Sequence, residues 1–142
     1  MDQRISLVTL AVDDLDAVRR FFEDGLGWIA SRQSQDGVVF FQTGGSVLAL
    51  YPRRSLETDI GRAIPSGPGG AVSLAWNGRS EAEVDAAYAQ ALAAGAEPVT
   101  APEKVFWGGY CAYVAIPGGH LLEISFNPFW PLGADGALTL PD

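Results

Sequence analysis

The sequence predicts an α+β fold in which two βαβββ modules form a curved eight-stranded mixed sheet, a half-open barrel with the helices on its convex face. The apolar pattern runs twice in the same order, each time a strand, a helix and three strands. Each copy ends in a hairpin joined by two glycines, Gly44-Gly45 and Gly118-Gly119. A module of about 60 residues is marginal alone, so the two are expected to form one structural domain.

The first module spans residues 1–52. Residues 5–12 are apolar except Ser6 and Thr9, which is typical of a strand covered on both faces. Asp13-Asp14 offers a helix N-cap, and apolar residues then recur at helical spacing before Gly25 and Gly27: Leu15, Val18, Phe22 and Leu26. Three further strands are expected over residues 28–34, 37–43 and 46–51.

A linker or long loop is expected over residues 53–70, because prolines and glycines recur there among charged residues. The second module follows over residues 71–129. Its first strand covers residues 71–77, and Ser80 to Glu83 form a capping box that begins a helix. Strands are then expected over residues 97–107, 109–116 and 121–126. Residues 130–142 form a C-terminal tail.

Charge and composition restrict the partners. Nine basic and 17 acidic side chains give a net charge of −8, which disfavours nucleic-acid binding. No apolar run approaches the length of a membrane span, and the first residues lack the pattern of a signal peptide. Cys111 is the single cysteine, and we expect a buried, inert thiol in a protein of the reducing cytoplasm.

Strand alternation predicts which side chains line the concave cup. A slip of one residue in any strand would invert the assignment for that strand. The expected lining comes from four strands: Leu7, Thr9 and Ala11; Val47, Ala49 and Tyr51; Val72, Leu74 and Trp76; Leu121, Glu123 and Ser125. The cup is therefore mostly apolar and holds one carboxylate.

Glu123 is the foremost candidate, either as a general base or as the partner of a cationic or hydrogen-bonding ligand group. The alternative is a leftover position bonded to Thr9, Tyr51 or water. Each aromatic candidate has both a ligand-contact interpretation and a packing one. These candidates are Trp76, Trp107, Tyr110 and Tyr113, with Trp28, Phe41, Phe129 and Trp130 as further possibilities.

Two stretches resemble the glyoxalase/bleomycin-resistance/dioxygenase superfamily, also called vicinal oxygen chelate proteins. One is Val8-Thr9-Leu10-Ala11-Val12-Asp13-Asp14-Leu15, followed by Phe21-Phe22 and Leu26-Gly27-Trp28. The other runs from Phe106-Trp107-Gly108-Gly109-Tyr110 through Tyr113, Pro117 and Gly119-His120-Leu121-Leu122-Glu123 to Asn127-Pro128. The resemblance covers roughly residues 4 to 130 and implies the βαβββ fold.

Enzymes of this superfamily hold a divalent metal with histidine and carboxylate ligands. The resemblance places the ligand positions at Leu7, Ala49, Val72 and Glu123, of which only Glu123 carries a donor atom. We therefore expect no metal and no other cofactor, which disfavours metal-dependent glyoxalase, dioxygenase and thiol-transferase activities.

The leading hypothesis is a metal-free protein of the bleomycin-resistance type that binds a small hydrophobic or aromatic molecule. The alternative is a metal-independent isomerase or lyase in which Glu123 is the general base. A third possibility is an interaction module without a ligand. Members of the superfamily commonly pair, so a homodimer is expected, without nucleic-acid or membrane partners.

Overall fold

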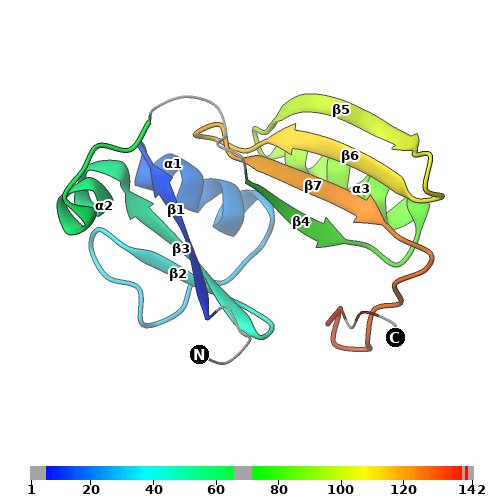
Figure 1. The fold of residues 1–142 in the computed structure, drawn as a ribbon, viewed down its shortest axis with the longest axis horizontal. Coiled ribbons are helices and arrows are strands. Elements are labelled where there is room, and N and C mark those ends of the chain that lie inside the picture. The colour runs from blue at the N-terminus through cyan, green and yellow to red at the C-terminus, as the bar shows by residue number, and fades with distance from the viewer. Residues whose placement is uncertain (1–5, 66–71, 139, 141–142) are drawn as a thin grey trace. The chain divides into compact units, whose positions relative to one another are not determined.

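The computed structural model describes residues 6–65, 72–138 and 140, and the chain divides into two compact units, residues 1–67 and 68–142 (Figure 1). Both are mixtures of helix and sheet, so the predicted α+β class with βαβββ modules is confirmed. The described strands number seven instead of eight, and they form sheets of three and four strands.

The first unit holds strand β1 (Leu7–Val12), helix α1 (Leu15–Arg20), the π-helical turn η1 (Phe21–Gly25), strands β2 (Val39–Thr43) and β3 (Ser46–Pro52), and helix α2 (Arg53–Ile60). The strand order is β1-β3-β2, with β1 parallel and β2 antiparallel to β3. The Asp14 side chain accepts a hydrogen bond from the Ala17 N–H at 2.8 Å, which confirms the predicted N-cap.

An aromatic cluster forms the core between the helical segment and the sheet of this unit. The Phe22 ring contacts the rings of Phe21, Trp28 and Phe41 at centroid distances of 5.3, 4.9 and 5.3 Å. Phe41 is 1% exposed, and its strand partner Leu48 is also buried. Trp28 and Phe41 are thus placed by packing, which was the simpler of their two interpretations.

The strand predicted over residues 28–34 is absent. Only an isolated bridge between Ala30 and Phe41 forms there. Two serines take over the backbone pairing: the Ser31 hydroxyl accepts from the Gln33 N–H, and the Ser34 hydroxyl accepts from the Phe40 N–H at 3.0 Å. Short hydroxyl side chains compete with a strand ladder in this way.

Residues 53–60 form helix α2 where a loop was predicted. Pro52 is its N-cap, and Gly61 ends it in the left-handed conformation, with a φ of 72°. The prolines and glycines that suggested a loop therefore lie outside the helix itself. Arg53 anchors it, because its guanidinium contacts the Asp13 carboxylate at 2.7 Å and donates to the Pro65 carbonyl at 2.9 Å.

The second unit holds strand β4 (Ser73–Asn77), helix α3 (Glu81–Ala93) and strands β5 (Glu97–Lys104), β6 (Tyr110–Ala115) and β7 (Leu121–Phe126). The strand order is β4-β7-β6-β5, so β7 lies between a parallel partner and an antiparallel one. The predicted capping box is confirmed at the start of α3. The Ser80 hydroxyl accepts from the Glu83 N–H, and the Glu83 carboxylate accepts from the Arg79 N–H.

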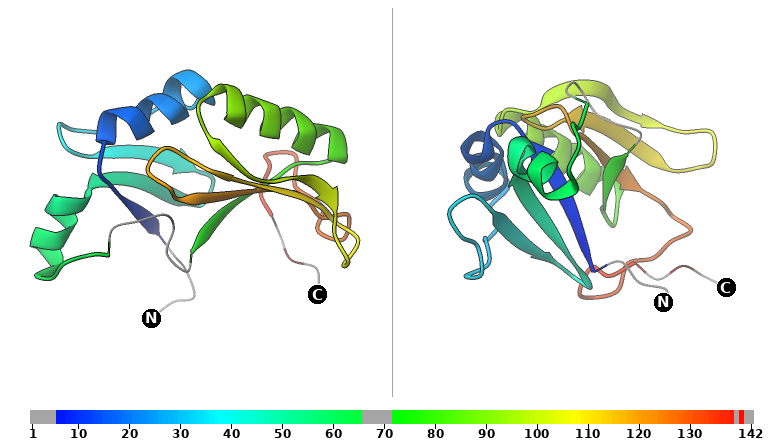
Figure 2. Two further views of the ribbon diagram at one scale, coloured as in Figure 1. Left: turned by 90° about the horizontal axis from the view of Figure 1, so that it is seen from above. Right: turned by 60° about the vertical axis from the view of Figure 1, so that its left-hand side comes forward.

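Helix α3 covers one face of this four-stranded sheet (Figure 2, left view). The Tyr110 hydroxyl of β6 donates to the Asp85 carboxylate of α3 at 2.9 Å. The Tyr110 side chain therefore lies on the α3 side of β6. Alternation then places Ala112 and Val114 under the helix, and both are fully buried. None of the helices in the described ranges has the length and hydropathy to cross a bilayer.

The C-terminal tail lies against the segment that leads into α3. The Arg79 guanidinium donates to the carbonyls of Gly133 and Ala134 at 3.2 and 3.4 Å. An isolated bridge between Leu132 and Leu138 closes the tail on itself.

The two neighbouring phenylalanines of β2 provide a test of the first core. Phe41→Ala removes a fully buried ring of the aromatic cluster, one that contacts Phe22 and Trp28, and should lower the free energy of unfolding by about 3–5 kcal/mol. Phe40→Ala, on the other side of the strand and half-buried, should cost only about 1 kcal/mol. Urea unfolding followed by circular dichroism measures both. Equal losses would show that Phe41 is not the side chain that the helical segment covers.

Candidate functional site

The candidate site lies on the side of the second sheet opposite α3. Cross-strand partners project to the same side of a sheet, so the residue pairs of β4, β7 and β6 define this side. We call it the Glu123 face, and it consists of Ser73, Ala75, Asn77, Cys111, Tyr113, Ala115, Leu121, Glu123 and Ser125. Tyr113, Leu121 and Glu123 were predicted to contact the ligand, and strand pairing brings these three together.

The predicted orientation of the first strand of this module is wrong. Ala75 pairs with Glu123, whereas Leu74 and Trp76 pair with Leu122 and Ile124, on the α3 side of β7. A shift of one residue moves every side chain of a strand to the other face. Val72 lies just before β4 and has the same place in the strand alternation as Leu74 and Trp76.

Trp76 packs near the start of α3 instead of lining the predicted cup. A Cβ built on Gly78 would lie 3.1 Å from the Trp76 ring and 3.1 Å from the Glu83 Cβ, so these groups are close neighbours. Tyr110 is likewise on the α3 side, where its hydroxyl bonds Asp85. Neither aromatic residue shares the face of Glu123.

Glu123 has different neighbours on its two sides. Tyr113 of β6 is directly opposite in the antiparallel pair, and the short, exposed Ala75 of β4 is its parallel partner. Leu121 and Ser125 precede and follow it on the same face of β7. Glu123 and Tyr113 are both half-buried, whereas Ser125 is 3% exposed. The face thus offers one carboxylate and one phenol beside small and apolar side chains.

Glu123 raises the pKa of both the Tyr113 phenol and the Cys111 thiol. Burial raises the pKa of Tyr113 above its ordinary value, and the charge of Glu123 and hydrogen bonding to it raise the pKa further. Burial also raises the pKa of Cys111, an effect that the hydrogen bond to Ser125 opposes and the Glu123 charge reinforces. The Cys111 Sγ lies 2.9 Å from the Ser125 Oγ. Cys111 is therefore buried as predicted, and its environment disfavours the reactive thiolate.

In the first unit, the corresponding predicted residues share one face. Thr9 pairs with Ala49, Leu7 with Val47, and Ala11 with Tyr51. The opposite side carries Leu48, whose partner Phe41 packs on Phe22. The orientation predicted for these strands is therefore correct. Tyr51 is hydrogen-bonded to α2, because its hydroxyl donates to the Asp59 carboxylate at 3.0 Å. This hydrogen bond is the foremost cause of the raised pKa of Tyr51.

Of the remaining aromatic candidates, Trp107 lies in the β5–β6 turn, whereas Phe129 and Trp130 follow β7. A Cβ on Gly109 would overlap the Trp107 indole, so this ring lies directly on the glycine backbone. A Cβ on Gly108 would lie 3.3 Å from the Phe129 ring. Both glycines thus serve the packing of the turn. Trp107 and Trp130 remain 38% and 41% exposed.

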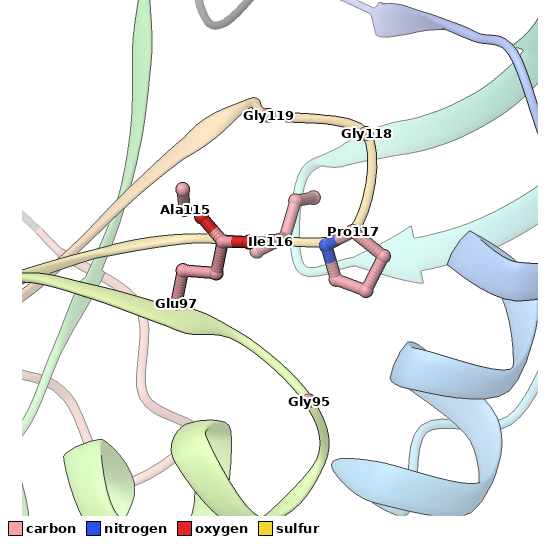
Figure 3. Close-up of a pocket in the computed structure, with 7 residues that line it drawn as sticks. All are labelled: Gly95, Glu97, Ala115, Ile116, Pro117, Gly118 and Gly119. Carbon is pink, nitrogen blue, oxygen red and sulfur yellow. The ribbon is translucent and has the colours of Figure 1, made fainter.

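Sequence reasoning missed a pocket at the other end of the second sheet (Figure 3). It has a volume of about 150 Å³ and is lined by Gly95, Glu97, Ala115, Ile116, Pro117, Gly118 and Gly119. In the sequence, only the glycines at the end of α3 and in the β6–β7 turn, Gly95, Gly118 and Gly119, could have indicated this pocket. Its one charged side chain, Glu97, is exposed, and the pocket does not include Glu123.

The metal-ligand positions implied by the family resemblance can be tested against strand pairing. Leu7 pairs with Val47, two residues before Ala49, and Ser73 pairs with Leu121, two residues before Glu123. The equivalent of Leu7 is therefore Ser73, so the assignment to Val72 is wrong by one residue. Leu7 and Ala49 have no donor atom, and a serine hydroxyl with one carboxylate is a poor donor set for zinc or iron.

No three His, Cys, Asp or Glu side chains gather into a possible metal site in the part of the chain that the structure describes. These residues do not fit the metal centre of the family's metalloenzymes.

Comparison with known proteins identifies the family. The model of the Glyoxalase/Bleomycin resistance protein/Dioxygenase superfamily matches residues 4–124. The crystal structure of a glyoxalase-related enzyme from Fulvimarina pelagi is 38% identical, with a TM-score of 0.91 and 99% of each chain covered.

Two further solved structures are similar. Lactoylglutathione lyase from Agrobacterium tumefaciens is 25% identical, with a TM-score of 0.72 over 94% of this chain and 100% of that one. A glyoxalase/bleomycin resistance protein/dioxygenase from Nocardioides is 26% identical, with a TM-score of 0.75 over 89% and 84%. No curated protein matched. With a family match over most of its length and this agreement in fold, the chain belongs to the Glyoxalase/Bleomycin resistance protein/Dioxygenase superfamily.

Proposed function

We propose that this protein binds a small hydrophobic or aromatic organic molecule without a metal ion, as a binder of the bleomycin-resistance type, and that the Glu123 face forms part of its site. The observation that carries the proposal is the placement of one carboxylate beside a phenol on a face that otherwise offers small and apolar groups. Apolar surface with a few oriented polar groups is typical of small-molecule sites.

The donor set supports the metal-free part of the proposal. Of the positions equivalent to the family's ligands, Leu7 and Ala49 are hydrocarbon side chains. A site built on Ser73 and Glu123 alone leaves most coordination positions of a zinc or iron ion without a protein ligand. The acidic net charge supports the wider proposal that the protein does not bind nucleic acid, and the single cysteine supports a cytoplasmic location. The homodimer in this proposal rests on membership of the superfamily.

A second function is favoured by the Glu123–Tyr113 pair itself. A carboxylate that accepts a proton beside a phenol that donates one suits a metal-independent isomerase or lyase. Glu123 would remove a proton from a carbon acid. In an isomerisation the proton would return to another carbon of the product, whereas in an elimination the Tyr113 phenol would donate a proton to the departing group. Similarity to a glyoxalase-related enzyme and to a lactoylglutathione lyase supports the assignment to an enzyme.

Two tyrosines on opposite sides of β6 test the binding proposal. A panel of aromatic compounds is first screened by thermal shift in the presence of a chelator, and hits are measured by calorimetry. Tyr113→Ala should weaken their binding about tenfold, because it removes a large contact from the Glu123 face. Tyr110→Ala, on the α3 side, should lower stability and leave affinity unchanged. Loss of all binding with the chelator, or equal effects of the two variants, would contradict the proposal.

The coupling between Tyr113 and Glu123 predicts a shift in phenol titration. Glu123→Gln removes the charge that disfavours the phenolate, so the pKa of Tyr113 should fall. It should stay above the ordinary value of 10.0, because burial remains the leading cause. Tyrosinate absorbance as a function of pH, compared with the same titration of Tyr113→Phe, isolates this residue. An unchanged pKa in Glu123→Gln would show that the two side chains are not coupled.

The enzymatic alternative predicts a separation of binding from turnover. In Glu123→Gln, ligand binding should survive, whereas exchange of a ligand's carbon-bound proton for solvent deuterium should fall at least about a hundredfold. Proton nuclear magnetic resonance in heavy water measures the exchange. Glu97→Gln, the same change on β5, should retain the full rate. A Glu123→Gln protein that exchanges at the wild-type rate rules out this base.

A further inference from the structure

No Lys or Arg side chain forms an ion pair with Glu123 among the residues of the second unit that the structure describes. Residues 68–142 contain eight acidic side chains but only two basic ones, Arg79 and Lys104. Arg79 donates to the tail carbonyls of Gly133 and Ala134, and Lys104 lies 3.7 Å from the Glu81 carboxylate. Neither ion pairs nor cationic hydrogen-bond donors reach Glu123 among the described residues.

The carboxylate also retains capacity to accept hydrogen bonds. An ionised carboxylate accepts at two oxygens and donates nothing. Its strand partner on one side, Ala75, has no polar atom and leaves room beside it, and Tyr113 on the other side has a single hydroxyl. The neighbouring Cys111 thiol hydrogen-bonds both the Ser125 hydroxyl and Glu123, and it is a weak donor. Among the described residues of the second unit, no cationic donor occupies the remaining acceptor positions, and a donor on a bound ligand suits them.

Resting on the proposed function, we propose that the ligand of this site presents a protonated amine to Glu123 while its apolar or aromatic body contacts Tyr113 and Leu121. An ammonium group supplies several donors and the opposite charge, and hydrogen bonds between ionised groups are about twice as strong as neutral ones. The Tyr113 ring beside the carboxylate adds a surface that attracts cations. Half-burial of Glu123 reduces the screening that makes exposed ion pairs weak.

Two probes of nearly equal shape separate this inference from the proposed function. 2-(1-Naphthyl)ethylamine carries the ammonium group, and 2-(1-naphthyl)ethanol replaces it with a neutral hydroxyl. Calorimetry on the full chain at neutral pH should show binding of both, with the amine tighter by about tenfold or more. The alcohol tests whether the face takes an aromatic guest, and the ratio of the two affinities tests the role of the charge.

Variants test whether the preference for the amine over the alcohol depends on Glu123. Glu123→Gln should reduce the ratio of amine to alcohol affinity to near one, and Glu123→Asp, which keeps the carboxylate, should retain part of it. Glu97→Gln is the matched control, because it removes the same charge from the same sheet and should leave the ratio unchanged. Thermal melts establish that each variant is folded.

The outcomes are distinct. If the alcohol binds but the amine shows no advantage, or if the advantage persists in Glu123→Gln, the inference is wrong and the proposed function stands. If Glu97→Gln reduces the ratio as much as Glu123→Gln does, the effect comes from net charge, and the inference is again wrong. Failure of both probes to bind would count against both the inference and the proposed function.

Discussion

The pairing of β7 with two strands at once determines the chemistry of the second unit. β7 forms a parallel ladder with β4 and an antiparallel ladder with β6, so its register is fixed from both sides. Because side chains alternate along a strand, this register places Ile124 under α3 and turns Glu123 to the other face. The same ladders place Tyr113 and Ala75 beside the carboxylate. A one-residue slip would bury Glu123 under the helix, where an unpaired carboxylate is costly.

Much of the fold could be predicted because several local signals act over short distances. The glycine pairs at the hairpins, the Asp14 cap and the Ser80–Glu83 box each need only neighbouring residues to form. Residues 28–34 and 53–60 show where this reasoning fails. In residues 28–34, a serine hydroxyl accepts the hydrogen bond that a strand ladder was predicted to make. Residues 53–60 were predicted to be a loop because Pro52 and Gly61, which lie at the two ends of helix α2, are residue types that also mark loops.

The site was predictable to the extent that each strand's orientation was. On β7, strongly apolar residues at Leu122 and Ile124 identified the α3 side, so the opposite side was predicted for Glu123, as strand pairing has it. On β4 the large residues Leu74 and Trp76 are on the α3 side, whereas small Ala75 lies with Glu123. The large size of Leu74 and Trp76 had been interpreted as a sign that they line the cup. A tryptophan that covers a glycine and the start of a helix cannot be distinguished by sequence from one that stacks on a ligand.

The surroundings of Glu123 distinguish two consequences of the proposed metal-free site, one for the charge of the carboxylate and one for its hydrogen bonds. A metal ion would neutralise the carboxylate and satisfy its oxygens. In the proposed metal-free site, with hydrocarbon side chains at Leu7 and Ala49, a ligand would have to fill both roles. The nearby thiol and hydroxyl of Cys111 and Ser125 are bonded to each other, and the two basic side chains of the unit are engaged elsewhere. Among the described residues of this unit, the Glu123 carboxylate is therefore the group of this face whose charge the proposed ammonium ligand would balance.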